Sequence, residues 1–184
     1  MMDRQPIDLA AVWADAMTFD SFLREGVEHK GLWEGIYRLA RIPDWVLDEV
    51  TDDDRRRLLV IAEDWCGDAS STIPILAKWA AQAPGLELRI IKRDEHPAVM
   101  DRYLTNGARA IPIVIVLDET NHELGHWGPR PAELQAWVRA NRDRIPKDEL
   151  YPQVRRWYAR DRGVSTLCEV AAVAGLAAAA DVYR

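Results

Sequence analysis

The sequence predicts an α/β fold, in which a central mixed sheet is flanked by helices and extra helices lie at both termini. Residues 58–62 and 113–117 are short, continuous apolar runs, which is the pattern of strands buried on both faces. Other segments carry apolar residues at the three- and four-residue spacing of amphipathic helices. A strand–helix–strand unit over residues 57–92, followed by a hairpin and a covering helix, builds such a sheet.

The first third of the chain is expected to be helical and to precede any strand. Phe19, Phe22 and Leu23 share one face at helical spacing, and Thr18 before them can cap the helix. Pro43 is expected to end the second helix of this region, because proline has no amide hydrogen to donate. The expected helices span residues 18–27, 32–41 and 43–50.

The middle of the chain alternates between strand and helix patterns. Leu86, Leu88 and Ile90 alternate with charged residues, as in a strand. Pro97 suits the first turn of a helix, where its missing amide hydrogen has no consequence. The expected strands span residues 57–63, 86–92, 113–117 and 123–127, the expected helices 70–83, 97–105 and 131–142, and a turn is expected at 118–121.

The end of the chain, residues 151–183, is expected to form two helices with a break near Gly163. Neither terminal segment is long enough to build a good core alone, so we expect both to pack onto the middle of the chain. The predicted organisation is a single domain over residues 1–184, with a helical N-terminal extension (1–56), a core (57–142) and a helical C-terminal extension (143–184).

Charge and composition exclude several classes of function. The net charge is −6, and the basic run at 55–57 directly follows an acidic run at 52–54, so no nucleic-acid partner is expected. The longest uncharged apolar run, residues 170–180, is mostly alanine and too short to cross a bilayer, so no membrane partner is expected. Residues 1–10 lack the apolar core that a signal peptide requires. We therefore expect a cytoplasmic protein.

The two cysteines, Cys66 and Cys168, are far apart in sequence. A structural disulfide between them is not expected in a compartment that keeps thiols reduced. No cofactor and no metal are expected either, because the histidines fall in different predicted elements and no glycine-rich phosphate loop is present. These histidines are His29, His96, His122 and His126.

The segment Trp65-Cys66-Gly67-Asp68-Ala69 lies where a predicted apolar strand ends and a predicted helix begins. A thiol at that place faces amide donors and the positive end of the helix dipole, and both stabilise a thiolate. The thiolate is the nucleophile of thiol–disulfide exchange. The alternative is that Cys66 is only a small buried apolar residue.

This turn and its surroundings resemble the thioredoxin superfamily, and most closely the bacterial thioredoxin-like proteins whose active-site turn reads Trp-Cys-Gly-Asp-Cys. That family has a proline eight residues after the first cysteine, which matches Pro74 after Cys66. It has a cis-proline before a core strand, which matches Pro112, and a glycine sixteen residues later, which matches Gly128. The resemblance covers residues 57–142 and implies a thioredoxin-like fold.

The resemblance also implies a role for each residue of the site. Cys66 is the implied catalytic residue, and the backbone of Ile111 is implied to lie beside its sulfur and to pair with an extended substrate segment. From the residues alone, a trans Pro112 at the start of a strand is permitted, and a cis X-Pro bond is the minority state. The implied partners are protein thiols or disulfides, or a low-molecular-weight thiol. The implied substrate-binding residues are Trp65, Gly67, Asp68, Ala69, Ile111 and Pro112.

The sequence departs from the family at two positions. Ala69 replaces the second cysteine, whose sulfur releases the mixed disulfide in a dithiol enzyme. Val60, six residues before Cys66, replaces the buried carboxylate of typical thioredoxins. The acidic residues nearest to Cys66 are expected to be solvated surface charges, although negative charge close to the thiol would oppose its ionisation. These residues are Glu63, Asp64 and Asp68.

Three functions remain open. The first is a monothiol redox protein in which Cys66 exchanges with disulfides and an external thiol resolves the product. The second is a non-catalytic module that binds an extended partner segment beside Trp65, Cys66 and Pro112. The third is a redox sensor in which Cys168 resolves oxidised Cys66, although Cys168 in its alanine-rich segment is expected to be core.

Overall fold

The computed structural model of the chain describes residues 6–26 and 28–176. The described residues form a five-stranded sheet in the order β1-β3-β2-β4-β5. Strands β2 and β3 are parallel, and the β1–β3, β2–β4 and β4–β5 pairs are antiparallel, so the sheet is mixed as predicted. The strands are β1 (Met17–Thr18), β2 (Arg56–Ala62), β3 (Leu86–Lys92), β4 (Ile113–Leu117) and β5 (Glu123–Trp127).

The two apolar runs of the sequence are the central strands of this sheet. Residues 58–62 of β2 and all of β4 are buried, because helices cover the sheet on both sides. The register places Val60 of β2 between Ile90 of β3 and Val114 of β4. The carboxyl end of β2, where the candidate site begins, is therefore fixed by neighbours on both edges.

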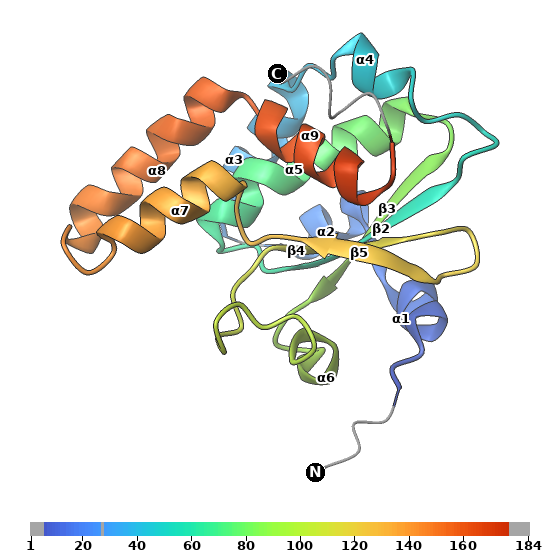
Figure 1. The fold of residues 1–184 in the computed structure, drawn as a ribbon, viewed down its shortest axis with the longest axis horizontal. Coiled ribbons are helices and arrows are strands. Elements are labelled where there is room, and N and C mark those ends of the chain that lie inside the picture. Colours follow the sequence, from blue (N-terminus) through green and yellow to red (C-terminus); the bar gives the residue numbers. More distant parts are fainter. Residues whose placement is uncertain (1–5, 27, 177–184) are drawn as a thin grey trace.

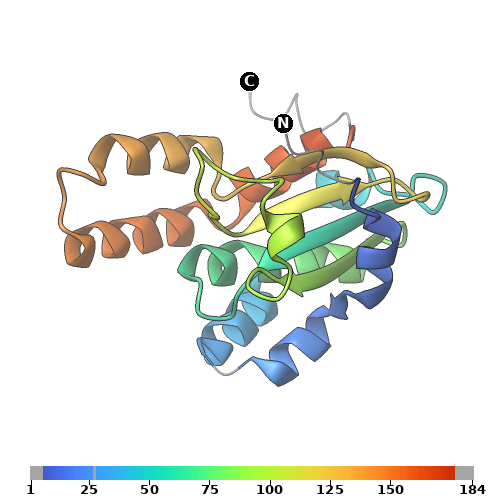
Figure 2. The ribbon, with the colours of Figure 1, turned by 90° about the horizontal axis from the view of Figure 1, so that it is seen from below.

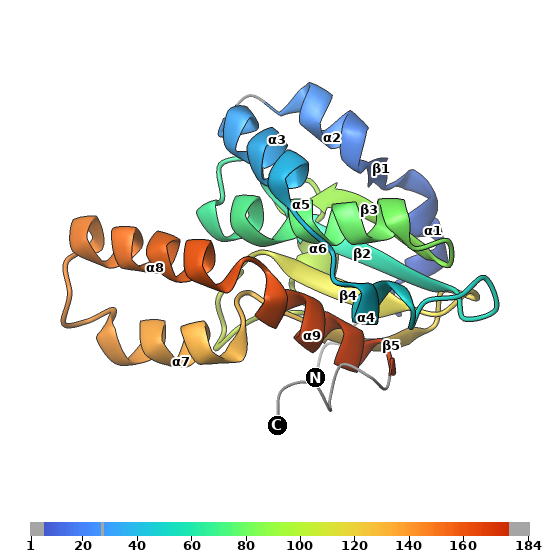
Figure 3. The same cartoon turned by 90° about the horizontal axis from the view of Figure 1, so that it is seen from above.

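The helices form a layer on each side of the sheet (Figure 1). Helices α5 and α9 lie over one face, while α1 and α6 lie on the other. Helix α3 packs against the outer side of α5, as Figure 3 shows. In the described residues the helices are α1 (Leu9–Asp15), α2 (Phe19–Glu25), α3 (Lys30–Leu39), α4 (Asp44–Leu47), α5 (Gly67–Gln82), α6 (Pro97–Met100), α7 (Ala132–Asn141), α8 (Lys147–Asp161) and α9 (Val164–Val173).

The N-terminal region differs from the prediction in two respects. Helix α1 was not expected, and the first strand, β1, lies between α1 and α2, so a strand does occur within the first third of the chain. A two-residue strand is too short to show alternation, and it forms because Met17 and Thr18 pair with the edge of β3. Thr18 also caps α2, as predicted, by accepting the Ser21 amide at 3.2 Å.

Helix α6 is shorter than predicted. It ends at Met100, and residues 101–108 form turns closed by a bridge between Thr105 and Ala108. The helical spacing did not reveal the tertiary contacts that hold this segment. Arg109 pairs with Asp101 at 2.7 Å, and the Tyr103 hydroxyl donates to Glu123 at 2.8 Å.

The C-terminal segment forms two helices that meet at Gly163, as predicted, although the first begins earlier, at Lys147. Helix α9 contributes Leu167, Val170 and Ala171 to the apolar cluster that contains the central strands. Residue 27 of the predicted first helix and residues 177–183 of the predicted last helix lie outside the described residues.

Helices α7 and α8 form an arm that extends to one side of the sheet (Figure 2). The arm has an apolar cluster of its own, formed by Leu134, Val138, Val154 and Tyr158. Tyr158 also reaches the candidate site, which lies where the arm joins the sheet. No helix in the described part of the chain has the length and apolar character needed to traverse a bilayer.

Candidate functional site

Cys66 lies at the junction between β2 and α5 and caps the N-terminus of that helix. Its Sγ accepts the Ala69 amide at 3.4 Å, and its carbonyl oxygen accepts the Ser70 amide at 2.9 Å. The side chain is buried, with 8% exposed. The sequence-predicted strand-to-helix position of the thiol is therefore correct.

A second turn meets Cys66 from the other side of the site. The Cys66 thiol donates to the carbonyl oxygen of Ile111 at 3.5 Å, and the Ile111–Pro112 peptide bond is cis. Gly128 supports this turn, because a Cβ there would lie 2.2 Å from the Pro112 carbonyl oxygen. The fold thus brings together Cys66, Ile111, Pro112 and Gly128, which the spacing of the sequence had singled out.

The thiol is not activated in the way that the sequence suggested. The pKa of the Cys66 thiol is raised from its usual 9.0 to about 11, mainly by burial and to a smaller extent by the negative charge of Asp68. The Ala69 and Asp68 amides at the helix terminus lower the pKa, but they do not offset the loss of water. The helix terminus therefore favours the thiolate, as expected, but burial outweighs this effect and leaves the pKa of the thiol above its usual value in the free protein.

Asp68 is not the solvated surface charge that was expected. Its Oδ1 accepts Nε of Arg130 at 3.0 Å and the Tyr158 hydroxyl at 2.8 Å. Its Oδ2 lies 2.6 Å from Nη2 of Arg130, and the two side chains are 11% and 18% exposed. Burial raises the pKa of the Asp68 carboxyl, and the charge of Arg130 and the hydrogen bond from Tyr158 counteract that effect.

Sequence reasoning missed Arg130 and Tyr158 as members of the site. Arg130 follows Gly128 by two residues, so its position beside a predicted site residue was a usable signal. Tyr158 lies in α8, ninety residues from Asp68, and no local pattern marks it.

The remaining residues of the turn differ in exposure. The Trp65 indole is 41% exposed, and the Arg93 guanidinium lies 4.9 Å from the centre of its ring. Gly67 is exposed, and a Cβ there would have no atom within 4 Å. Ala69 is fully buried. Trp65 therefore offers an aromatic surface beside a buried thiol.

The other acidic residues near the turn also have internal partners. Glu63 is buried and accepts the Asp94 amide at 2.9 Å, and Asp64 accepts the Glu28 amide at 2.9 Å. Glu63 is therefore not the solvated charge that was expected, because the Asp94 backbone lies over it, whereas Asp64 is half-buried and its hydrogen bond lies at the surface. Val60 is fully buried among apolar side chains.

Cys168 lies in α9, and its side chain is buried. The two cysteines form no disulfide with each other in the described structure. No cluster of three side chains suited to a metal ion occurs within residues 6–26 and 28–176.

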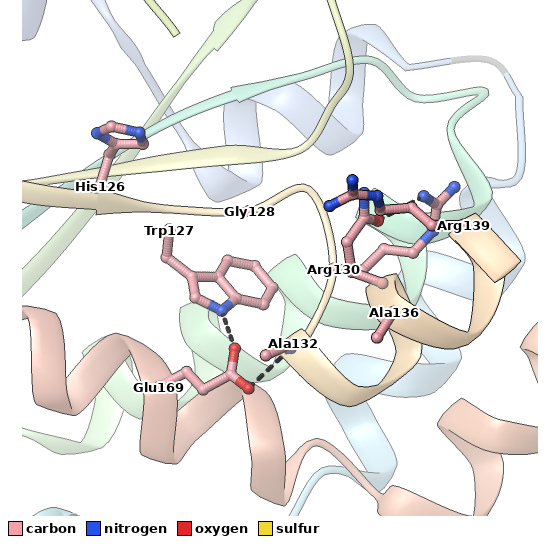
Figure 4. A pocket seen from close by; sticks show the side chains of 9 residues that line it. His126, Trp127, Gly128, Arg130, Ala132, Ala136, Arg139 and Glu169 are labelled. Carbon is pink, nitrogen blue, oxygen red and sulfur yellow. Dashed lines mark hydrogen bonds between the residues drawn. The ribbon is translucent and has the colours of Figure 1, made fainter. Parts of the chain in front are cut away.

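A pocket of about 370 Å³ lies between the end of β5 and α7, and Arg130, the partner of Asp68, is one of its lining residues (Figure 4). Arg130 and Gly128 form part of its wall, together with Arg139. At its floor, Glu169 accepts Nε1 of Trp127 at 2.6 Å and the Ala132 amide at 2.9 Å. These bonds tie α9 to the start of the arm.

Comparisons with known proteins agree with this architecture. A family model described as thioredoxin matches residues 16–146. The match includes α2, α3 and α4, which lie outside the narrower range of 57–142 that the resemblance had covered, and α1 precedes it. A search of curated proteins returned no match.

Two solved structures share the fold. A protein of unknown function from Pseudomonas aeruginosa is 23% identical, with a TM-score of 0.70 over 91% of this chain and 97% of that one. An HIV epitope-scaffold is 21% identical, with a TM-score of 0.69 over 89% of this chain and 95% of that one. At these identities the likeness concerns the fold alone.

Proposed function

The chain belongs to the thioredoxin family, and on that premise we propose that Cys66 is a monothiol that forms long-lived mixed disulfides. The observation that carries this proposal is the position of its Sγ, which caps α5 and faces the backbone of Ile111, while Ala69 stands where a resolving thiol would be. The proposed partners are protein disulfides or the disulfide of a low-molecular-weight thiol. A cytoplasmic location is part of the proposal.

The proposed step is a simple exchange. Cys66 loses its proton to solvent, its thiolate attacks one sulfur of the partner disulfide, and a new S–S bond forms as the other sulfur leaves as a thiolate. The electrons balance without a further oxidant. An external thiol must reverse the step, because Ala69 has no sulfur with which to attack.

The raised pKa of Cys66 makes both directions slow. At neutral pH only a small fraction of the thiol is ionised, so attack is slow. A thiol with a pKa of about 11 is also a poor leaving group, so the mixed disulfide is slow to be displaced. These properties suit a covalent trap better than a turnover enzyme.

Non-catalytic binding is the second candidate function. It is favoured by the burial of Cys66 and by the hydrogen bond from its thiol to Ile111, both of which describe an unreactive sulfur. In this case an extended partner segment would lie beside the exposed Trp65 indole and pair with the backbone at Ile111, without covalent chemistry.

Intact-mass spectrometry after incubation with glutathione disulfide tests the first proposal. We expect one glutathione adduct per chain, located at Cys66 and persistent after the disulfide is removed. Cys66→Ser should lose the adduct, and Cys168→Ser should retain it. We also expect no insulin reduction above the Cys66→Ser control, because no internal thiol resolves the product.

Two results would contradict the proposal. If the parent and Cys66→Ser form no adduct and capture the same partner proteins, the contacts are non-covalent and the binding function replaces it. If Cys168→Ser changes the persistence of the adduct, Cys168 resolves Cys66 and the protein is a redox sensor.

A further inference from the structure

The Asp68 carboxylate is held on both of its oxygens. Arg130 contacts Oδ1 and Oδ2 at 3.0 Å and 2.6 Å, and Tyr158 donates to Oδ1 at 2.8 Å. Gln135 accepts Nη1 of Arg130 at 3.0 Å and so fixes the guanidinium as well. Because Asp68 is 11% exposed, these donors replace most of its water. The result is a fixed negative charge two residues from Cys66.

The contacts of Cys66 itself select the thiol over the thiolate. Its Sγ donates to the carbonyl oxygen of Ile111, and only the protonated sulfur has a hydrogen to donate. A thiolate at the same place would face the lone pairs of that oxygen. The Ala69 amide bonds the sulfur in either state.

The charged and titratable groups around the thiol come from three parts of the chain. They are Asp68 in α5, Arg130 in the segment after β5, and Tyr158 in α8. The repulsion of a thiolate by Asp68 exceeds its attraction by Arg130. Since the site excludes water, these charges are weakly screened.

We propose that Asp68, held by Arg130 and Tyr158, is a positioning residue that adds to the effect of burial in disfavouring the Cys66 thiolate and so slows the reaction of Cys66 with disulfides. The inference rests on the proposed function, because it takes Cys66 as the reacting group. It makes α8, which begins after the end of the thioredoxin match at residue 146, a part of the site.

The test is the pH dependence of Cys66 alkylation by iodoacetamide, measured on the full chain with Cys168→Ser. Asp68→Asn removes the charge and keeps the shape of the side chain. We expect the rate at pH 8 to rise about threefold to tenfold, as the thiolate fraction grows. We also expect the inflection of the rate profile to move to lower pH. If Asp68→Asn does not fold, we expect the same rise in rate and the same shift of the inflection for Asp68→Ser.

Glu63→Gln is the matched control. Glu63 is also a buried carboxyl next to the turn, but its Oε1 accepts the Asp94 amide. We therefore expect Glu63→Gln to show the same pH dependence of Cys66 alkylation as the parent. An unchanged profile for Asp68→Asn overturns the proposal, as does an equal shift in Glu63→Gln. A faster rate at every pH with the same inflection also overturns it, because it reports a more open site.

The experiments distinguish a failure of this inference from a failure of the proposed function. Alkylation requires no disulfide substrate, so an unchanged alkylation profile overturns the role of Asp68 alone. A failure to form the glutathione adduct, in a chain whose alkylation profile does shift, overturns the mixed-disulfide function alone.

Discussion

At the scale of one residue, Ala69 leaves the proposed exchange site without an internal thiol that could release a mixed disulfide. Its backbone amide lies 3.4 Å from the Cys66 sulfur, and its methyl group is fully buried. A second thiol at this position would therefore lie in the first turn of α5, close to the first thiol.

Ala69→Cys should restore that chemistry. We expect an intramolecular disulfide between positions 66 and 69 after mild oxidation, and insulin reduction above that of the parent, because the second sulfur can displace a bound partner. Thiol counting by mass spectrometry and the insulin assay measure the two effects. Cys66→Ser with Ala69→Cys is the control. If the disulfide forms and activity stays absent, the missing carboxylate at Val60 or a blocked groove is the better explanation.

At the scale of elements, the site depends on the contact between the end of β5 and the turn before β4. Gly128 has a φ of +127°, which side chains with a Cβ rarely adopt, and the Pro112 carbonyl occupies the place of a Cβ. The same segment carries Arg130 to Asp68. One short connection therefore places both the Ile111–Pro112 turn and the partner of Asp68.

Gly128→Ala should disrupt this contact. We expect a loss of about 2–4 kcal/mol in the free energy of unfolding, because the methyl group forces the backbone of Pro112 or of residue 128 to move. Urea denaturation followed by tryptophan fluorescence measures it. Gly35→Ala in α3 is the control, since a Cβ there meets no atom within 4 Å, and a gain of up to about 1 kcal/mol is expected. Equal effects of the two substitutions would contradict the role of Gly128.

At the scale of the whole molecule, the two halves of the C-terminal extension differ in how they are held. Helix α9 lies in the main core through Leu167 and Val170, which are fully buried. Helix α8 packs mainly on α7. The Tyr158 hydroxyl of α8 donates a hydrogen bond to Asp68 and so connects the arm to the site. We therefore expect the extension to be required for folding as well as for the environment of Cys66.

Removal of residues 151–184 should lower the melting temperature or the solubility, because it exposes the core beneath α9. The point variant Leu167→Ala should cost about 2–5 kcal/mol of the free energy of unfolding through the cavity it leaves. Leu39→Ala is the control, since Leu39 is 74% exposed and its loss should change stability by about 0.5 kcal/mol or less. Thermal and urea denaturation measure these effects. An unchanged melting curve after truncation would show that the extension is dispensable.

Residue patterns within short stretches of the chain predicted most of the fold. The apolar runs of β2 and β4 predicted the central strands, because burial on both faces leaves no polar positions. Features without such a pattern were missed or misplaced. Strand β1 exists only by pairing with β3, and the end of α6 depends on the distant partners of Tyr103 and Asp101.

The sequence by itself determined the family, the strand-to-helix position of Cys66 and the absence of a second thiol at Ala69, since each is written in adjacent residues or fixed spacings. Only the tertiary structure determined the burial of that thiol and the groups that surround it. Asp68 has two partners, Arg130 and Tyr158, which lie 62 and 90 residues away from it along the chain. Burial and charge at Cys66 depend on atoms that folding brings together, and no local pattern can encode a pKa that distant side chains and excluded water produce.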